Sequence, residues 1–132
     1  MVHINRLTKV NLYLYVFLLL GITACGDYSV SLPNGYTLVS VYSGAILINH
    51  PHEGIAVEAN IDSYQVIGDL VVGHSTSAEL LPEKGFSKPG YFILDTRTRK
   101  VLQALDRTTW LSNLAKLGVS EVPVLNKPSR FG

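Results

Sequence analysis

Three histidines are the residues of this chain best suited to binding a metal ion or a small ligand. His50 and His52 stand two positions apart and are followed at once by the carboxylate of Glu53, and His74 lies further along the chain. Imidazole and carboxylate groups bind zinc and copper, but a zinc site needs three or four converging ligands. The pattern therefore predicts either a ligand or metal site at His50, His52 and His74, or an exposed polar loop between two strands.

No arrangement of residues typical of catalysis is recognisable. Ser75 follows His74 directly, but neighbouring side chains on a strand point to opposite faces. The Gly-x-Ser-x-Gly turn of many hydrolases would need glycine where Ser77 stands. No carboxylate pair has a spacing suited to acid–base catalysis, and no glycine-rich phosphate loop occurs. The sequence predicts a protein that is not an enzyme.

Four basic residues surround a predicted hairpin tip and the start of a predicted helix. They are Arg97, Arg99, Lys100 and Arg107. Guanidinium groups bind carboxylates and phosphates through paired hydrogen bonds. The four residues predict a partner-binding patch for an acidic protein or for anionic lipid head groups. The alternative is a solvated turn that keeps a small β-protein soluble.

Composition limits the classes of protein that remain. The chain has 132 residues, of which 47% are hydrophobic and 16% charged, and these values indicate one globular domain rather than a disordered chain. A formal net charge of +1 argues against a nucleic-acid partner, which calls for a strongly basic face. The single cysteine excludes an internal disulfide and a zinc site built from cysteines.

The N-terminus has the pattern of an export signal. Arg6 and Lys9 stand in a segment without acidic residues, and a largely apolar run follows from Leu12 to Ala24. As a helix, this run would span roughly 20 Å, which is less than the hydrocarbon core of a bilayer at about 30 Å. A positive segment before a short apolar run is typical of a signal peptide. An uncleaved anchor and a buried core helix are the alternatives.

The apolar run ends at the segment Ile22-Thr23-Ala24-Cys25, which resembles the lipobox of bacterial lipoproteins. The resemblance implies that residues 1–24 are removed and that Cys25 becomes an acylated first residue, so that the only prosthetic group is a covalent lipid. Two or three acyl chains anchor a protein stably to a bilayer. Because Gly26 rather than aspartate follows the cysteine, the resemblance implies the periplasmic face of the outer membrane in a Gram-negative cell. Removal of Arg6 and Lys9 changes the formal net charge from +1 to −1.

The remaining chain reads as a succession of β-hairpins closed by one helix. Alternating apolar residues, β-branched residues and turn residues predict strands over 27–32, 36–42, 45–48, 55–62, 64–67, 70–72, 91–94 and 101–104. A long loop is expected over 75–89. Helical spacing of Trp110, Leu111, Leu114 and Leu117, with an N-cap at Asp106 or Thr108, predicts a helix over 107–117.

These elements predict an α+β domain over residues 25–120, followed by a loosely held tail over 121–132. Its expected architecture is an antiparallel meander of six to eight strands with the helix packed on one face. A small β-sandwich or barrel with the helix at one end is the alternative. In general style the chain resembles small lipoproteins of Gram-negative bacteria, some of which neutralise a toxin delivered into the periplasm.

The function expected from these features is that of a membrane-anchored envelope lipoprotein. It would act without catalysis, as a structural module or as a module that binds a protein, and toxin neutralisation is one version of this hypothesis. The alternative is a periplasmic carrier of a small ligand or metal that uses the histidines.

Overall fold

The computed structural model describes residues 28–41, 44–58, 60–77 and 88–129. The predicted export signal, Cys25 and most of the predicted loop 75–89 lie outside the described residues. The first sheet is antiparallel with the strand order β1-β2-β3-β4, and the short 3-10 helix η1 joins its first two strands. Its elements are β1 (Ser29–Ser31), η1 (Pro33–Gly35), β2 (Thr37–Ser40), β3 (Ile46–His50) and β4 (Gly54–Val57).

A second antiparallel sheet, with the order β5-β6-β7-β8, follows and leads into the helix. Its strands are β5 (Asn60–Ile67), β6 (Leu70–Thr76), β7 (Gly90–Asp95) and β8 (Val101–Leu105), and the helix is α2 (Arg107–Lys116). The predicted hairpins within 64–72 and 91–104 are confirmed, because β5 pairs with β6 and β7 pairs with β8. Thr76 belongs to β6, so the predicted loop begins later than residue 75.

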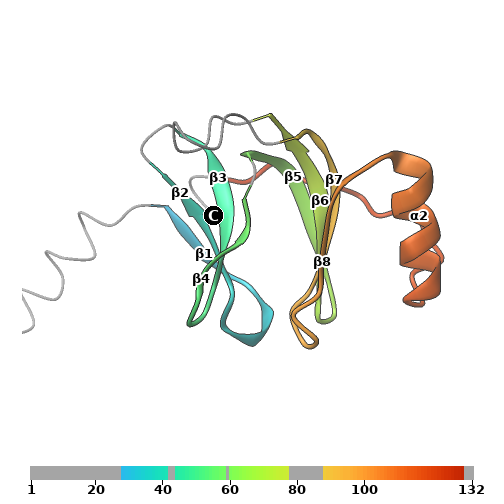
Figure 1. The fold of residues 1–132 in the computed structure, drawn as a ribbon, viewed down its shortest axis with the longest axis horizontal. Helices are drawn as coiled ribbons and strands as arrows, with labels where there is room; N and C mark the ends of the chain where they lie inside the picture. The colour runs from blue at the N-terminus through green and yellow to red at the C-terminus, as the bar shows by residue number, and fades with distance from the viewer. Residues whose placement is uncertain (1–27, 42–43, 59, 78–87, 130–132) are drawn as a thin grey trace, which may run out of the picture.

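The two sheets and the helix form three layers, in the order first sheet, second sheet, helix (Figure 1). The main hydrophobic core lies between the sheets. It contains Leu32, Tyr36, Leu38, Ile48, Val57, Ile61, Val71, Phe92 and Leu94. A second cluster joins the other face of the second sheet to α2 through Val72, Ile93, Trp110 and Leu114. The predicted α+β class, with eight antiparallel strands and a helix on one sheet face, is confirmed.

The division into two sheets occurs inside a segment that the alternation predicted as one strand, residues 55–62. β4 ends at Val57 and β5 begins at Asn60, and these strands belong to different sheets. Val57 and Ile61 are both buried in the core between the sheets, whereas Ile55 is 52% exposed. The alternation therefore identified the buried residues Val57 and Ile61 correctly, but the prediction of a continuous strand is wrong.

Helix α2 begins at Arg107 as predicted and ends at Lys116, one residue before the predicted end. Asp106 is the N-cap, and its carboxylate accepts a hydrogen bond of 2.7 Å from the backbone N–H of Thr109. At the other end Gly118 has a φ of 88°, and the backbone N–H of Val119 donates to the carbonyl of Leu114 at 2.9 Å. The hydrogen bond from Val119 to Leu114 and the left-handed Gly118 form a Schellman motif. These two ends set the length of the helix that covers the second sheet.

Capping by Asp106 predicts a dependence of stability on pH. The hydrogen bonds from Thr109 lower the pKa of Asp106, so its cap stabilises the fold above the carboxyl's ordinary pKa and loses this effect as pH falls through the folded-state pKa. We expect Asp106→Ala to lower the melting temperature at pH 7 and the difference from the parent to shrink at acidic pH. Asp106→Asn, which caps without a charge, is the matched control. The difference in melting temperature between Asp106→Asn and Asp106→Ala should not shrink at acidic pH. A constant difference between parent and Asp106→Ala down to pH 2.5 would contradict the prediction.

The residues that follow α2 do not form the loosely held tail expected from their composition. The backbone of Asn126 exchanges two hydrogen bonds with Tyr64, at 2.9 and 3.0 Å, and so adds a bridge to the free edge of β5. Leu125 packs against the cluster under α2. The described part of this segment, up to residue 129, is therefore held to the edge of the second sheet at Tyr64.

Candidate functional site

Four connections between strands lie at the same end of the molecule, which we call the loop end (Figure 1). They are residues 33–35, 51–53, 68–69 and 96–100. The beginning of the described chain lies at the opposite end, where the backbone carbonyl of Tyr28 accepts a hydrogen bond from Ser40, the last residue of β2. Each strand of a meander reverses direction, so every second connection returns to the loop end.

Side-chain hydrogen bonds hold the loop end together across the two sheets. Asn34 in η1 donates to the hydroxyl of Thr96 at 2.9 Å and to the carboxylate of Asp69 at 3.2 Å. Thr96 is buried, and its hydroxyl also donates to the backbone carbonyl of Asp69. Three of the four connections are thus fixed relative to one another, which makes the loop end a preformed surface.

His50 and Glu53 meet Arg99 at this end. The Arg99 guanidinium lies 4.0 Å from the Glu53 carboxylate, and both side chains are well exposed, so this ion pair contributes little to stability. His50 packs edge-on against Tyr36, with ring centroids 5.0 Å apart. Together with Ile55, Ala56 and Val101, these four residues line a small cleft of about 240 Å³.

Neither nitrogen of His50 is presented to a metal ion. Its Nδ1 accepts a hydrogen bond from the backbone N–H of His52 at 3.1 Å, which leaves the proton of a neutral ring on Nε2. In the part of the chain that the structure describes, Nε2 is buried without a hydrogen-bond partner. His52 itself is exposed, and its ring centroid lies 6.4 Å from that of His50.

His74 lies in the second sheet, away from the other two histidines. An extra residue in β5 at Asp62 forms a β-bulge, and the Asp62 carboxylate meets Nδ1 of His74 at 2.8 Å. The His74 ring also contacts Tyr91, which stacks on Trp110 under α2. The prediction that His50, His52 and His74 converge is wrong, because His74 faces the helix layer. No group of three metal-binding side chains occurs within residues 28–41, 44–58, 60–77 and 88–129.

Ser75 and His74 point to opposite faces of β6, as expected for neighbours on a strand. Ser75 is 3% exposed, and its hydroxyl donates to the backbone carbonyl of Gly90 at 3.2 Å. His74 instead contacts Asp62 and Tyr91. The hydroxyl therefore ties β6 to the start of β7.

The residues of the predicted basic patch lie at opposite ends of β8. Arg97, Arg99 and Lys100 lie in the connection at the loop end, whereas Arg107 begins α2 at the opposite end of the strand. The prediction that all four side chains form one surface is therefore wrong for Arg107. Lys116, in the last turn of α2, takes its place, because α2 runs back toward the loop end (Figure 1).

Lys100 and Lys116 line the same cleft between α2 and the sheet, which we call the helix groove. Its volume is about 290 Å³, and it is lined by Ile93, Asp95, Lys100, Leu102, Asn113, Lys116 and Leu117. Leu102 is 41% exposed and Leu117 is 47% exposed. The sequence pattern assigned Leu117 to the buried stripe of the helix, but Leu117 is the C-cap residue and its side chain borders the groove instead.

The carboxylate of Asp95 is used by its own turn. It accepts hydrogen bonds from the backbone N–H groups of Arg97 at 3.0 Å and Thr98 at 3.2 Å. Burial acts to raise the pKa of Asp95, but these hydrogen bonds outweigh it and lower the pKa. Asp95 is therefore ionised at neutral pH and holds the 95–100 turn in place beside the groove.

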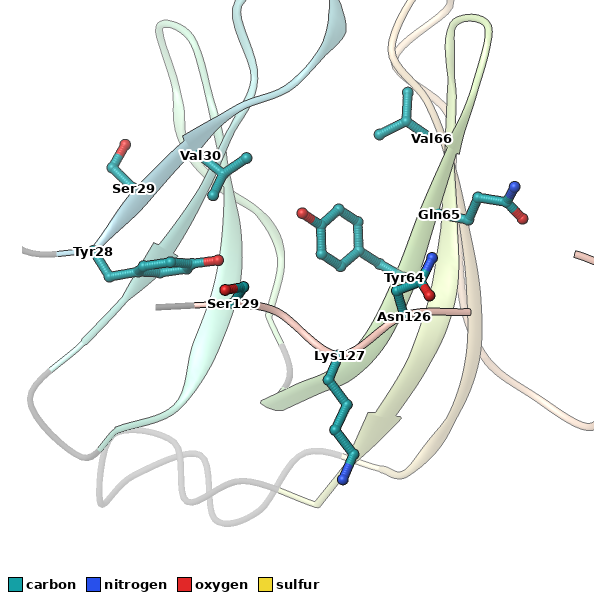
Figure 2. A pocket seen from close by; sticks show the side chains of 9 residues that line it. All are labelled: Tyr28, Ser29, Val30, Tyr64, Gln65, Val66, Asn126, Lys127 and Ser129. Atoms are coloured by element: carbon teal, nitrogen blue, oxygen red, sulfur yellow. The ribbon is translucent and has the colours of Figure 1, made fainter. Parts of the chain in front are cut away.

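A larger cleft of about 600 Å³ opens between the edge strands β1 and β5 (Figure 2). Tyr64 points from β5 toward β1, and Gln65, which also lines the cleft, points away from β1. Burial, and to a smaller extent the neighbouring Tyr64, raise the pKa of Tyr28. This edge cleft lies beside the first described residues, away from the loop end.

Comparisons with known proteins do not extend these observations. No protein-family model matches the chain, and no curated protein or solved structure matches it. In the described ranges, no helix is long and apolar enough to cross a membrane.

Proposed function

We propose that this protein is a lipid-anchored module of the cell envelope that binds another protein through its loop end. The observation that carries the proposal is the short distance in sequence between Cys25 and the first strand. Ser29, the first residue of β1, stands only four positions after Cys25. Four residues reach at most about 14 Å. An acylated Cys25 therefore keeps the start of β1 close to the bilayer and directs the loop end away from it.

The loop end has the properties of a binding surface rather than of a catalytic site. Hydrogen bonds from Asn34 and Thr96 hold three connections in fixed positions. Charged side chains such as Arg97 and Arg99 are exposed there. Polar groups on preformed loops bind a partner at a small cost in conformational entropy. Neutralisation of a toxin in the periplasm and a structural role in the envelope are two forms that this binding would take.

Cross-linking from opposite ends of the molecule tests the proposal. A photoreactive amino acid is placed at Thr98, in the loop end, or at Lys88, which is exposed near the start of β7 at the other end. In cells of the native host, we expect a discrete protein adduct from position 98 and none from position 88. Adducts from position 88 alone, or equal adducts from both positions, would contradict binding through the loop end.

A substitution of the anchoring residue tests the membrane arm separately. Cys25→Ser should accumulate as an unprocessed precursor that incorporates no labelled fatty acid, because serine cannot form the thioether. Thr98→Ser is the matched control and should be processed and labelled like the parent. Normal processing and labelling of Cys25→Ser would contradict the lipid anchor while leaving the cross-linking result to be judged on its own.

A further inference from the structure

Resting on the proposed function, we propose that the helix groove is where the partner protein docks, through an acidic segment that carries one large apolar side chain. The apolar side chain would lie between Leu102 and Leu117. Carboxylates on either side of it would meet Lys100 and Lys116. The partner is thus defined by its chemistry, as an acidic amphipathic stretch of polypeptide.

The apolar part of the groove motivates the inserted side chain. Leu102 comes from β8 and Leu117 from the end of α2, and both border the same cleft above Ile93. Each leucine leaves more than two fifths of its surface exposed, although the helix buries Trp110 and Leu114 almost completely. Burial of one leucine or phenylalanine side chain in such a cleft is favourable by about 1.5–3 kcal/mol before the cost of ordering is counted.

The charges around the groove motivate the acidic flanks. In the described part of the chain, neither Lys100 nor Lys116 forms an ion pair. The one carboxylate that lines the groove, Asp95, is bound by the backbone of its own turn. Two unpaired lysines at the rim therefore attract carboxylates from a second molecule and orient its approach.

The position of the groove favours a protein over a lipid. Lys100 directly precedes β8 at the loop end, and α2 ends near the loop end (Figure 1). Lys116, the last residue of α2, lines the same groove as Lys100. The chain from Cys25 enters the fold at the opposite end, beside the last residue of β2. Lipid head groups of the anchoring bilayer are therefore on the far side of the domain from both lysines.

Binding of a defined peptide tests the inference. The probe is a fluorescein-labelled peptide with one leucine between pairs of aspartate and glutamate, and fluorescence anisotropy follows its binding to the full acylated chain in detergent micelles. We expect saturable binding that weakens at least tenfold in the double variant Lys100→Glu/Lys116→Glu. Lys88→Glu/Lys127→Glu changes the net charge equally outside the groove and should bind like the parent. Leu102→Ser should also weaken binding, whereas Val41→Ser, at a comparably exposed apolar site beyond the end of β2, should not.

Several results would overturn the inference. One is equal binding of the acidic peptide to the parent and to Lys100→Glu/Lys116→Glu when both melt at the same temperature. Another is equal affinity of the parent for the acidic peptide and for its asparagine and glutamine analogue. A third is binding of short-chain phosphatidylglycerol at the groove without binding of the peptide. If any of these occurs while cross-links still form from position 98, the groove assignment is wrong and the proposed function stands. If the cross-links from position 98 are lost while the peptide still binds at the groove, the proposed function is wrong and the groove assignment stands.

Discussion

Replacing Gly73 by alanine is expected to destabilise the fold more than any other exchange of a described glycine for alanine. A Cβ atom at position 73 would overlap the backbone carbonyl oxygen of Ser63 and come within 2.7–2.8 Å of two ring carbons of Phe92. The carbonyl belongs to the neighbouring strand β5 and cannot move without breaking the β5–β6 ladder. We expect a loss of about 3 kcal/mol in the free energy of unfolding, at the upper end for overpacked cores. The melting temperature should fall by roughly 12–24 °C.

The comparison with Gly54→Ala separates steric overlap from backbone strain. Gly54 has a φ of 91°, but a Cβ atom there would meet no atom within 4 Å. Its replacement should cost only about 1–2 kcal/mol, from the left-handed backbone. Thermal unfolding of both variants, followed by circular dichroism, measures the difference. Equal destabilisation by the two replacements would contradict the steric overlap expected at Gly73.

Replacing Trp110 by alanine should weaken the contact between α2 and the second sheet severely. Trp110 is 1% exposed, stacks on Tyr91 with ring centroids 4.5 Å apart, and donates its indole N–H to the carbonyl of Phe92 at 3.1 Å. That carbonyl lies where the register between β7 and β8 shifts. Trp110→Ala removes a large core side chain and leaves a buried acceptor, and we expect a cost of about 3–5 kcal/mol.

Two further variants divide this cost into its parts. Trp110→Phe keeps an aromatic ring against Tyr91 but removes the donor, and it should cost about 1–3 kcal/mol. Leu117→Ala removes an exposed side chain from the end of the same helix and should cost less than about 1 kcal/mol. Calorimetry suits these variants because Trp110 is the only tryptophan of the chain. A loss for Leu117→Ala as large as that for Trp110→Ala would contradict the layered core.

The parts of the fold that could be predicted from sequence are those set by neighbouring residues. The cap at Asp106 and the left-handed Gly118 are local signals, and both ends of α2 follow from them. The hairpin between β5 and β6 likewise follows from the Gly68–Asp69 turn. Such elements depend on only a few consecutive residues, so the local pattern is sufficient to locate them.

The passage from one sheet to the other could not be predicted in this way. Period-two alternation continues from Val57 to Ile61 because both side chains enter the same core, although their strands belong to different sheets. No proline or glycine stands between them to indicate the break. Two strands that face the same core from opposite sheets give the same alternation as one continuous strand. Only the three-dimensional arrangement therefore shows that the sheets are separate.

The candidate site was predictable only in part for a related reason. Lys100 is predictable because it lies beside Arg97 and Arg99 in sequence, and the same proximity in sequence wrongly includes Arg107. Lys116 is distant in sequence and reaches Lys100 only because α2 folds back along β8. Likewise, Asp62 meets His74 through a bulge that shifts the register by one residue. Contacts that depend on chain reversal or register have no signature in the spacing of residues.

The bridge between Asn126 and Tyr64 has a consequence for many copies of this domain crowded on one surface. The unpaired backbone groups of an edge strand can bind a strand from a neighbouring copy. A high local concentration on a surface favours this pairing. Asn126 occupies the backbone groups of Tyr64 that a neighbour would otherwise pair with. A copy without Asn126 would leave the backbone groups of Tyr64 open to a strand from a neighbouring copy.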